Sequence, residues 1–266
     1  MSSPPAVPYW REAGVGPAVV CLHANASVSG QWRPLMSRLA DRRRLLAPDA
    51  YGAGQSPEWP SDRTITLADE VQLIEPVLAQ AGERYALVGH SYGGAVALRA
   101  AAQQPDRVSA LVLYEPTLFA LIDADGPAPN DADGIRQAAA ATAAAALDAG
   151  DTDAAARAFI DYWTGPGSWD NLPEDRRPGM ARSIANVRRW AHALFTEPMP
   201  LAALPMPVLI MTGSGSTAAA HGVARRLMLA LPNVTHIEFA GLGHMGPITH
   251  PDVVNAEIER FLLAAT

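Results

Sequence analysis

The sequence has a single cysteine and no excess of basic residues. Cys21 cannot form an intrachain disulfide and lies in an apolar run, so we expect a buried thiol in a reducing compartment. The formal net charge of -7 gives no support for a nucleic-acid partner, which requires a basic face. Arg42, Arg43 and Arg44 form the longest basic run, and we expect them at a solvated helix end.

The sequence also has no long apolar run. Residues 1–9 have neither a basic segment nor an apolar segment of the kind found in signal peptides. No apolar run approaches the roughly 20 residues needed to span a bilayer. Hydrophobic residues nevertheless make up 49% of the 266 positions, enough for a sizeable core. We therefore expect a cytoplasmic globular protein with no membrane association.

The most informative stretch is Leu87-Val88-Gly89-His90-Ser91-Tyr92-Gly93-Gly94. A short apolar strand, residues 85–88, leads directly into a small-residue helix that starts near Tyr92. Gly89, Ser91 and Gly93 match the Gly-x-Ser-x-Gly pattern of a nucleophile elbow, in which the serine hydroxyl projects from a tight strand-to-helix turn. The flanking glycines are needed because strand and helix pass too closely for side chains. Ser91 is the predicted nucleophile.

Apolar runs alternate with helical patterns on both sides of this stretch. Such alternation predicts an α/β fold with a parallel sheet and helices on both faces. The predicted strands are residues 17–22, 45–49, 85–88, 108–114, 207–211 and 234–239. Thr66 and Asp69 form a predicted capping box that opens the helix before residues 85–88.

The alternation stops between residues 117 and 200. This stretch shows no strand pattern and contains helix candidates at residues 134–149, 154–162 and 183–195. We therefore expect a core domain formed by residues 1–116 and 201–266, with residues 117–200 inserted as an all-helical cap.

A serine nucleophile needs a base within hydrogen-bonding reach. His244 follows the last predicted strand in the loop Gly241-Leu242-Gly243-His244-Met245, which can bring its imidazole above the strand ends. His221, His236 and His250 lie at helix or strand positions and read as structural. His244 is the predicted base.

An acyl-transfer site also needs donors for a developing oxyanion. The backbone N–H of Tyr92 is the first expected donor, because it follows the nucleophile. The second should come from the loop after residues 17–22, with Asn25 favoured and Ala24 behind it. His23 is expected to order this loop by hydrogen bonds.

Four motifs together resemble the α/β-hydrolase superfamily and occur in its order. The resemblance covers nearly the whole chain, and it implies an eight-stranded, mostly parallel sheet with a helical cap after the sixth strand. It implies no cofactor and no metal. The motifs are Cys21-Leu22-His23, Pro48-Asp49 with Gly52-x-Gly54-x-Ser56, Gly89 to Gly94, and Gly243-His244-Met245-Gly246-Pro247.

This sequence departs from the superfamily at the expected acid. The acid usually follows the seventh strand, but the turn Thr212-Gly213-Ser214-Gly215-Ser216 has no carboxylate, and Gly215 stands at its place. Other members place the acid after the sixth strand, where this chain has Glu115. Glu115 is therefore the favoured partner of His244, the alternative being a loop cap or an ion pair with the cap. Asp123 and Asp125 are weaker candidates.

Aromatic residues in the insertion indicate where substrate binds. They could line an apolar pocket over Ser91 or form the core of the insertion. Because no arginine or lysine stands in the catalytic loops, a neutral, hydrophobic ester is favoured. The aromatic residues are Phe119, Phe159, Trp163, Trp169, Trp190 and Phe195, and the predicted substrate-binding set is His23, Phe119, Trp163, Trp169, Trp190 and Met245.

The favoured function is hydrolysis of a small-to-medium hydrophobic carboxylic ester through an acyl-enzyme on Ser91. The same residues could instead cleave a C–C bond, transfer the acyl group to another acceptor, or only bind a ligand in a lapsed enzyme. Dehalogenase and epoxide hydrolase activities are disfavoured, because those relatives have Asp where this chain has Ser91. The expected partner is a small ester-like molecule, and the chain is expected to be a monomer or homodimer.

Overall fold

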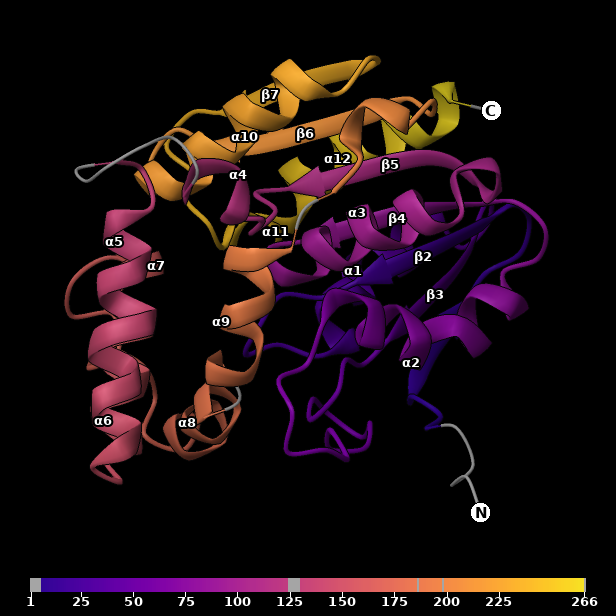
Figure 1. Ribbon diagram of the computed structural model, residues 1–266. Coiled ribbons are helices and arrows are strands. Elements are labelled where there is room, and N and C mark those ends of the chain that lie inside the picture. The colour runs from indigo at the N-terminus through magenta and orange to yellow at the C-terminus, as the bar shows by residue number, and fades with distance from the viewer. Residues whose placement is uncertain (1–5, 124–129, 186, 198, 266) are drawn as a thin grey trace.

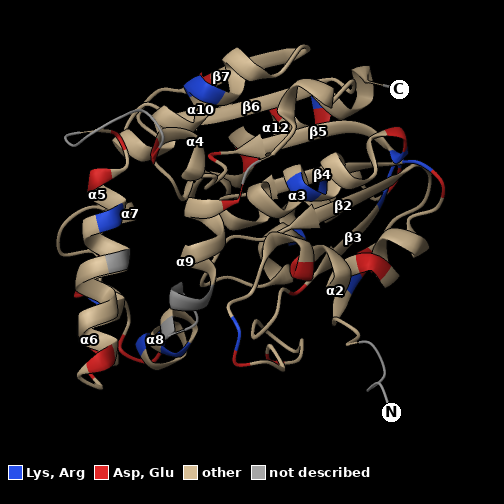
Figure 2. Ribbon diagram, viewed as in Figure 1, with Lys and Arg blue, Asp and Glu red and all other residues tan. Residues whose placement is uncertain are grey.

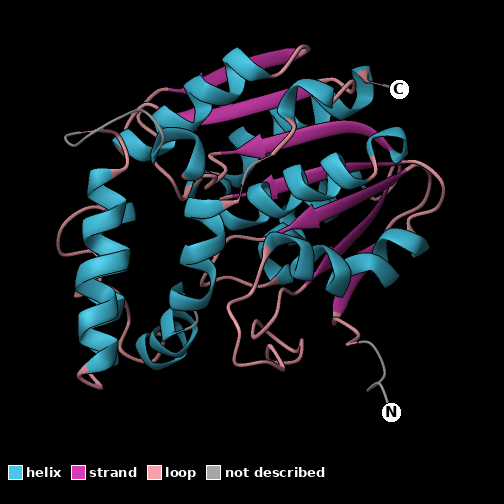
Figure 3. Cartoon of the chain, viewed as in Figure 1, coloured by secondary structure: helices cyan, strands magenta, loops and turns pink. Residues whose placement is uncertain are grey.

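A computed structural model describes residues 6–123, 130–185, 187–197 and 199–265. Its centre is one twisted sheet of seven strands in the order β1-β3-β2-β4-β5-β6-β7 (Figures 1 and 3). β1 runs antiparallel to β3, and every other neighbouring pair is parallel. The strands are β1 (Trp10–Ala13), β2 (Ala18–Leu22), β3 (Arg44–Pro48), β4 (Tyr85–His90), β5 (Val108–Tyr114), β6 (Val208–Gly213) and β7 (Val234–Phe239).

All six strands expected from apolar runs are present, and the mostly parallel α/β fold is confirmed. The expected count of eight is wrong for the described residues, which form seven strands. Only β1 precedes β2 there, and Trp10 pairs directly with Pro48 at the edge of the sheet. β1 was not predicted because its four residues are mostly half-buried and show no apolar run.

Helices cover both faces of the sheet, and the alternation of side chains along each strand supplies two cores. Val20 and Leu87 pack on the side of α2, α3 and α10, whereas Val19 and Val88 pack on the side of α1 and α12. The core helices are η1 (Ser29–Trp32), α1 (Arg33–Leu39), α2 (Leu67–Gln80), α3 (Tyr92–Gln103), η2 (Pro105–Arg107), η4 (Leu201–Ala203), α10 (Ala218–Ala230), α11 (Gly246–Thr249) and α12 (Pro251–Ala264).

Several local predictions can be checked against this core. The capping box is confirmed, since Asp69 N donates to Thr66 Oγ1 at 3.1 Å and Thr66 N donates to Asp69 Oδ2 at 2.8 Å. Cys21 is fully buried, and burial raises the pKa of its thiol. The expectation of a solvated basic run is wrong for Arg43, which is buried and donates to the Leu262 carbonyl oxygen at 2.5 Å.

Between β5 and β6, the described residues form only helices and loops. The six parallel strands point their carboxyl ends toward these helices, which stand beyond that edge of the sheet (Figure 3). Residue 125 lies outside the described residues, and with it the candidate Asp125. The helices of the insertion are α4 (Ala120–Asp123), α5 (Asp133–Ile135), η3 (Arg136–Ala143), α6 (Ala144–Asp148), α7 (Thr152–Thr164), α8 (Arg177–Ala185) and α9 (Val187–Thr196).

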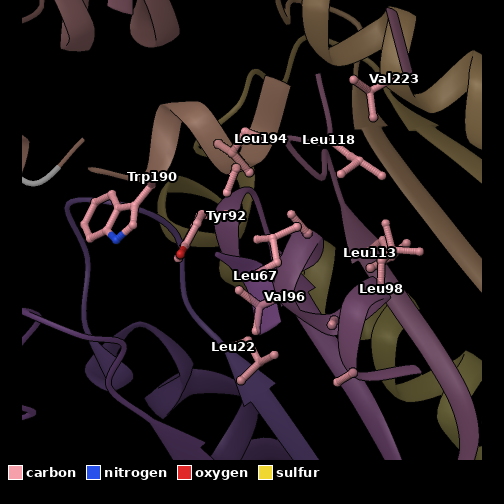
Figure 4. Packing of buried hydrophobic residues seen from close by; sticks show 14 of the residues in the cluster. Leu22, Leu67, Tyr92, Val96, Leu98, Leu113, Leu118, Trp190, Leu194 and Val223 are labelled. Carbon is pink, nitrogen blue, oxygen red and sulfur yellow. The ribbon is translucent and has the colours of Figure 1, made fainter. Parts of the chain in front are cut away.

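Polar and aromatic contacts hold α9 against the core. Arg99 of α3 donates to Glu197 Oε2 at 2.6 Å, and Leu67 N donates to Glu197 Oε1 at 2.8 Å. The Trp190 and Tyr92 rings lie 5.1 Å apart between centroids, and Figure 4 shows the two side chains facing each other. The insertion is therefore fixed to the core beside the residue that follows Ser91.

Charged residues of both signs are interspersed along the helices and loops (Figure 2). No helix among the described residues is both long enough and apolar enough to cross a membrane.

Candidate active site

Ser91 lies in the turn between β4 and α3, with φ 56° and ψ -119°. A side chain at Gly89 or Gly93 would not fit this turn. A Cβ on Gly89 would lie 2.5 Å from the Gly93 carbonyl oxygen, and one on Gly93 would lie 2.2 Å from the Leu22 carbonyl oxygen. The close passage of β4, α3 and β2 therefore requires both glycines of the predicted elbow.

Three non-glycine residues in the described part of the chain have positive φ: Ala26, Ser91 and Glu115. Such conformations cost free energy and concentrate at functional sites. Ala26 is in the loop after β2, Ser91 is in the elbow, and Glu115 directly follows β5. The strained positions thus lie in the segments that carry the predicted nucleophile, the predicted acid and the predicted oxyanion donor Asn25.

The structure brings Ser91, His244 and Glu115 into one hydrogen-bonded row. His244 Nε2 lies 2.9 Å from Ser91 Oγ, and His244 Nδ1 lies 2.8 Å from Glu115 Oε2. All three side chains are buried. Because a carboxylate only accepts hydrogen bonds, Nδ1 carries the proton in neutral His244, which leaves Nε2 free to accept from the serine hydroxyl.

Glu115 accepts hydrogen bonds from the turn after β6, the turn in which this sequence has no carboxylate. Its Oε1 accepts from Gly213 N at 2.7 Å and from Ser216 Oγ at 2.5 Å. These donors orient the carboxylate so that Oε2 faces His244. Asp123 instead pairs with Arg136 and does not face the imidazole.

Two backbone N–H groups are available beside Ser91. Tyr92 is the first residue of α3, so its N–H has no acceptor within the helix. Among the described residues, the N–H of Asn25 has no acceptor either. The expectation that Ala24 could donate is not met, because Ala24 N already donates to Gln31 Oε1 at 3.2 Å.

Gln31 begins a chain of hydrogen bonds that joins the loop after β2 to the loop that carries His244. Its Nε2 lies 3.0 Å from His90 Nδ1, and His90 Nε2 lies 2.8 Å from the His244 carbonyl oxygen. The directions are consistent if His90 is neutral with its proton on Nε2. Burial and the nearby His244 ring hold the pKa of His90 well below its usual range, which keeps it neutral. No sequence pattern pointed to Gln31.

Replacing Gln31 with methionine should lower kcat about tenfold, because Ala24 and His90 each lose a hydrogen bond worth ~1 kcal/mol. KM should change less, since Gln31 borders neither cavity at Ser91 among the described residues. Steady-state kinetics with a chromogenic ester would measure this. Gln72→Met, at an exposed position of α2, is the matched control. Equal kcat in the two variants would contradict the positioning effect.

Two cavities meet at Ser91, and Asn25, Ser91, Phe159 and Trp163 border both. The small compartment, of about 20 Å³, is also lined by Thr117, Phe119, Ile135, Ala139, Ala191, Leu194 and Phe195. The large compartment, of about 430 Å³, is also lined by Ala24, Ala26, Ile160, Thr164, Ser168, Leu172, Arg176, Met180, His244, Met245, Ile248 and Thr249.

The predicted substrate-binding residues divide into two groups. Phe119, Trp163 and Met245 border these compartments. Trp169 and Trp190 are not among the described residues that border them. The indole N–H of buried Trp169 donates to Asp153 within the insertion, and Trp190 packs on Tyr92. Both tryptophans serve packing, which an aromatic count cannot distinguish from pocket lining.

His23 is not among the described residues that border the two compartments. The expectation that it orders its loop is confirmed. His23 Nε2 accepts from Ala50 N at 3.0 Å, and Nδ1 donates to the Ala24 carbonyl oxygen at 2.7 Å. Burial lowers the pKa of this imidazole.

Trp163 lies directly against the predicted base. Its ring and the His244 ring are stacked, 3.9 Å apart between centroids and 23° from parallel. This contact places the indole face of Trp163 over the imidazole of His244. The described residues contain no group of three or more His, Cys, Asp or Glu side chains placed to hold a metal ion.

Glu70 is a buried carboxyl group behind Tyr92. It accepts hydrogen bonds from Tyr92 Oη at 3.2 Å and Tyr51 N at 3.3 Å. Burial raises its pKa to about 8. A group with a raised pKa in the folded state binds more protons there than in the unfolded state, so its contribution to stability is lost as pH rises toward that pKa.

Glu70→Gln should therefore become more stable relative to the parent protein as pH rises from 5 to 8, because the neutral amide needs no proton. The free energy of unfolding in urea, measured across this range for both proteins, would test it. Glu83→Gln, at an exposed position, should show no such trend. A pH-independent difference between the Glu70 variant and its parent would contradict the raised pKa.

Comparisons with known proteins identify the fold family of the chain. The sequence profile described as "alpha/beta hydrolase fold" matches residues 17–251. Pimeloyl-(acyl-carrier protein) methyl ester esterase of Aliivibrio salmonicida is 28% identical over 261 residues, covering 96% of this chain and 95% of the relative.

Two solved structures show the likeness in three dimensions. An enol-lactonase from Burkholderia xenovorans matches with a TM-score of 0.74 at 18% identity, covering 96% of each chain. A thermophilic esterase from Thermogutta terrifontis matches with a TM-score of 0.75 at 21% identity, covering 97% of this chain and 93% of the other. At these identities the likeness concerns the fold alone.

Proposed function

The chain belongs to the α/β-hydrolase fold family, and we propose that it hydrolyses carboxylic esters through an acyl-enzyme on Ser91. The observation that carries the proposal is the row of hydrogen bonds from Ser91 Oγ through His244 to Glu115 Oε2. A serine hydroxyl becomes a useful nucleophile when a base accepts its proton and an acid holds that base in the correct tautomer.

In the first half of the reaction, Ser91 Oγ attacks the ester carbonyl carbon while His244 Nε2 takes the hydroxyl proton. The carbonyl oxygen becomes an oxyanion, which accepts hydrogen bonds from the N–H groups of Tyr92 and Asn25. The C–O bond then breaks, His244 gives its proton to the departing alkoxide, and the acyl group remains on Ser91.

In the second half, a water molecule attacks the acyl carbon and His244 takes its proton. The tetrahedral intermediate expels Ser91 Oγ, which recovers the proton from His244, and the carboxylic acid leaves. Glu115 and the face of Trp163 stabilise the imidazolium that forms in both halves. The name of the Aliivibrio relative, a methyl ester esterase, favours the same bond type.

We also propose that residues 117–200 act as a cap over a core of residues 1–116 and 201–266. The proposal is supported by the wall residues of both compartments. Phe119, Phe159, Trp163 and Phe195 come from the insertion, whereas Ser91 and His244 come from the core. The substrate would then bind between the two parts.

C–C bond hydrolysis and acyl transfer would use the same residues, and a lapsed binding protein would use none of them. A p-nitrophenyl ester assay separates ester hydrolysis, acyl transfer and ligand binding. The proposal predicts a burst of p-nitrophenol followed by steady release of free acid, and covalent labelling by a fluorophosphonate. Release of acid that gives way to a new ester when an alcohol is added would favour acyl transfer. The absence of both burst and labelling would favour a binding protein.

A further inference from the structure

The two compartments at Ser91 differ in size and in their access to His244. His244 borders the large compartment and is not among the described residues that line the small one. In the proposed function, on which this inference rests, His244 gives a proton to the departing alcohol, so the alcohol portion occupies the large compartment. The small compartment, of about 20 Å³, holds roughly one water-sized group, which limits the acyl portion to a short chain.

The hydroxyl groups on the wall of the large compartment are already bonded within the fold. Each donates to the backbone carbonyl oxygen four residues earlier in the chain: Thr164 at 2.7 Å, Ser168 at 3.0 Å and Thr249 at 3.1 Å. Apolar side chains such as Ile160 and Leu172 make up most of the remaining wall. The compartment therefore suits an apolar chain along most of its length.

Arg176 is the exception on this wall. It is the only arginine or lysine among the described residues that line the large compartment, and no aspartate or glutamate is among them. Its side chain is exposed, and no carboxylate of the described residues forms an ion pair with it. The neighbouring Arg177 instead donates to the carbonyl oxygens of Leu172 at 3.0 Å and Asp170 at 2.6 Å. Of these two arginines, the fold uses one and leaves the other open to a ligand.

Arg176 lies where the large compartment meets an outer groove of about 690 Å³, and it borders both. Neither Ser91 nor His244 is among the described residues that line the groove. A chain that starts at Ser91 and fills the large compartment therefore comes to Arg176 before it enters the groove. Charges of both signs line the groove, so an anion is favoured at Arg176 rather than farther out. The other charged residues of the groove are Glu58, Asp175 and Arg182.

We propose that Arg176 binds a carboxylate at the end of an apolar chain on the alcohol portion of the ester. A guanidinium presents paired N–H groups that match the two oxygens of a carboxylate. One guanidinium with Asp175 beside it in the sequence suits a single negative charge better than the nearly two charges of a phosphate group. The preferred substrates are short-acyl esters of ω-hydroxycarboxylic acids, with Arg176 as a specificity-determining residue. This replaces the neutral ester expected from the catalytic loops, because the cation comes from the insertion.

The test compares the acetate esters of ω-hydroxyoctanoic acid and ω-hydroxyoctanamide, whose end groups differ in charge but hardly in shape. The end group is too far from the ester bond to alter its intrinsic reactivity. The kcat/KM for acetate release should be about fivefold higher for the acid, the upper range for an ion pair open to solvent. This preference should shrink as salt is added, because salt screens an exposed charge pair. Equal rates for acid and amide at low salt would overturn the carboxylate site.

Arg176→Gln removes the charge and should bring the ratio of acid to amide near one, whereas Arg176→Lys should retain part of the preference. Arg182→Gln is the matched control, because Arg182 is exposed and borders the outer groove but is not among the described residues that line the large compartment. It should keep the parental ratio. An equal loss of preference in the Arg176→Gln and Arg182→Gln proteins would overturn the assignment, because the net charge of the surface would then explain the effect.

Two further substrates test the orientation and the kind of anion. Monomethyl suberate carries its carboxylate on the acyl portion, and faster Arg176-dependent hydrolysis of this ester would overturn the assignment of the alcohol to the large compartment. Faster hydrolysis of ω-acetoxyoctyl phosphate than of the carboxylate would overturn the choice of a carboxylate. Each of these results leaves ester hydrolysis intact. If no ester is cleaved and a fluorophosphonate fails to label Ser91, the proposed function itself fails.

Discussion

Replacing Ser91 with alanine is expected to lower kcat for ester hydrolysis by about a million-fold, the loss seen when a comparable catalytic serine is removed. The reason is that no acyl-enzyme can form without Ser91 Oγ, the hydroxyl oxygen that lies 2.9 Å from His244 Nε2. Steady-state assays with a p-nitrophenyl ester would measure the loss, with attention to traces of parent enzyme.

The Ser91→Ala protein should fold normally, because alanine removes one oxygen from a turn whose shape depends on Gly89 and Gly93. Ser61→Ala, at an exposed position, is the matched control and should retain parental activity. Retention of more than roughly a hundredth of kcat in the Ser91 variant would mean that another group is the nucleophile.

Replacing Glu115 with glutamine should lower kcat by about 10⁴, the cost of the corresponding acid-to-amide exchange, aspartate to asparagine, in a well-studied serine protease. Glu115 Oε1 accepts from Gly213 N and Ser216 Oγ, so the glutamine oxygen will keep that place. The amide NH2 then faces His244 Nδ1 and stabilises the tautomer with its proton on Nε2. That tautomer cannot accept the Ser91 proton.

Glu238→Gln provides a control for the same chemical exchange on an exposed strand position. Both variants should show parental circular dichroism, so that a loss confined to the Glu115 variant reports on catalysis. If Glu115→Gln retains kcat within a few-fold of the parent protein, another carboxylate or none supports His244, and Glu115 is only a loop residue.

Local sequence patterns predicted the elbow well because its requirements are local. The close approach of β4, α3 and β2 admits no side chain at Gly89 or Gly93, so the glycine spacing itself carries the geometry. His244 was also predictable, because a glycine-rich loop directly after the last parallel strand lies above the carboxyl ends of the strands, where Ser91 also lies. Each of these residues is positioned by its immediate neighbours.

Features that depend on contacts between distant segments were less predictable. Glu115 could be named only as a candidate, because its orientation depends on Gly213 and Ser216, about a hundred residues away in sequence. Ala24 was overestimated as a donor because the competing acceptor on Gln31 follows seven residues later with no pattern to mark it.

The roles of the aromatic residues in the insertion were equally difficult to predict from sequence. Trp163 borders both compartments and stacks on His244, whereas Trp169, six residues along, bonds Asp153 inside the insertion. Both residues are tryptophans, so hydrophobicity cannot distinguish them. Only the packing of α7 against the core determines which of the two lies at the site. Arg43 is a comparable case, since its burial depends on the Leu262 carbonyl oxygen of the last helix.

The rate of fluorophosphonate labelling, with the labelled residue located by peptide mass, tests the central claim most directly. The parent protein should be labelled at Ser91, and Glu115→Gln should be labelled at the same residue at least about a hundredfold more slowly, because the misoriented imidazole no longer activates the hydroxyl. Labelling at another residue, or equal rates in the two proteins, would contradict the account.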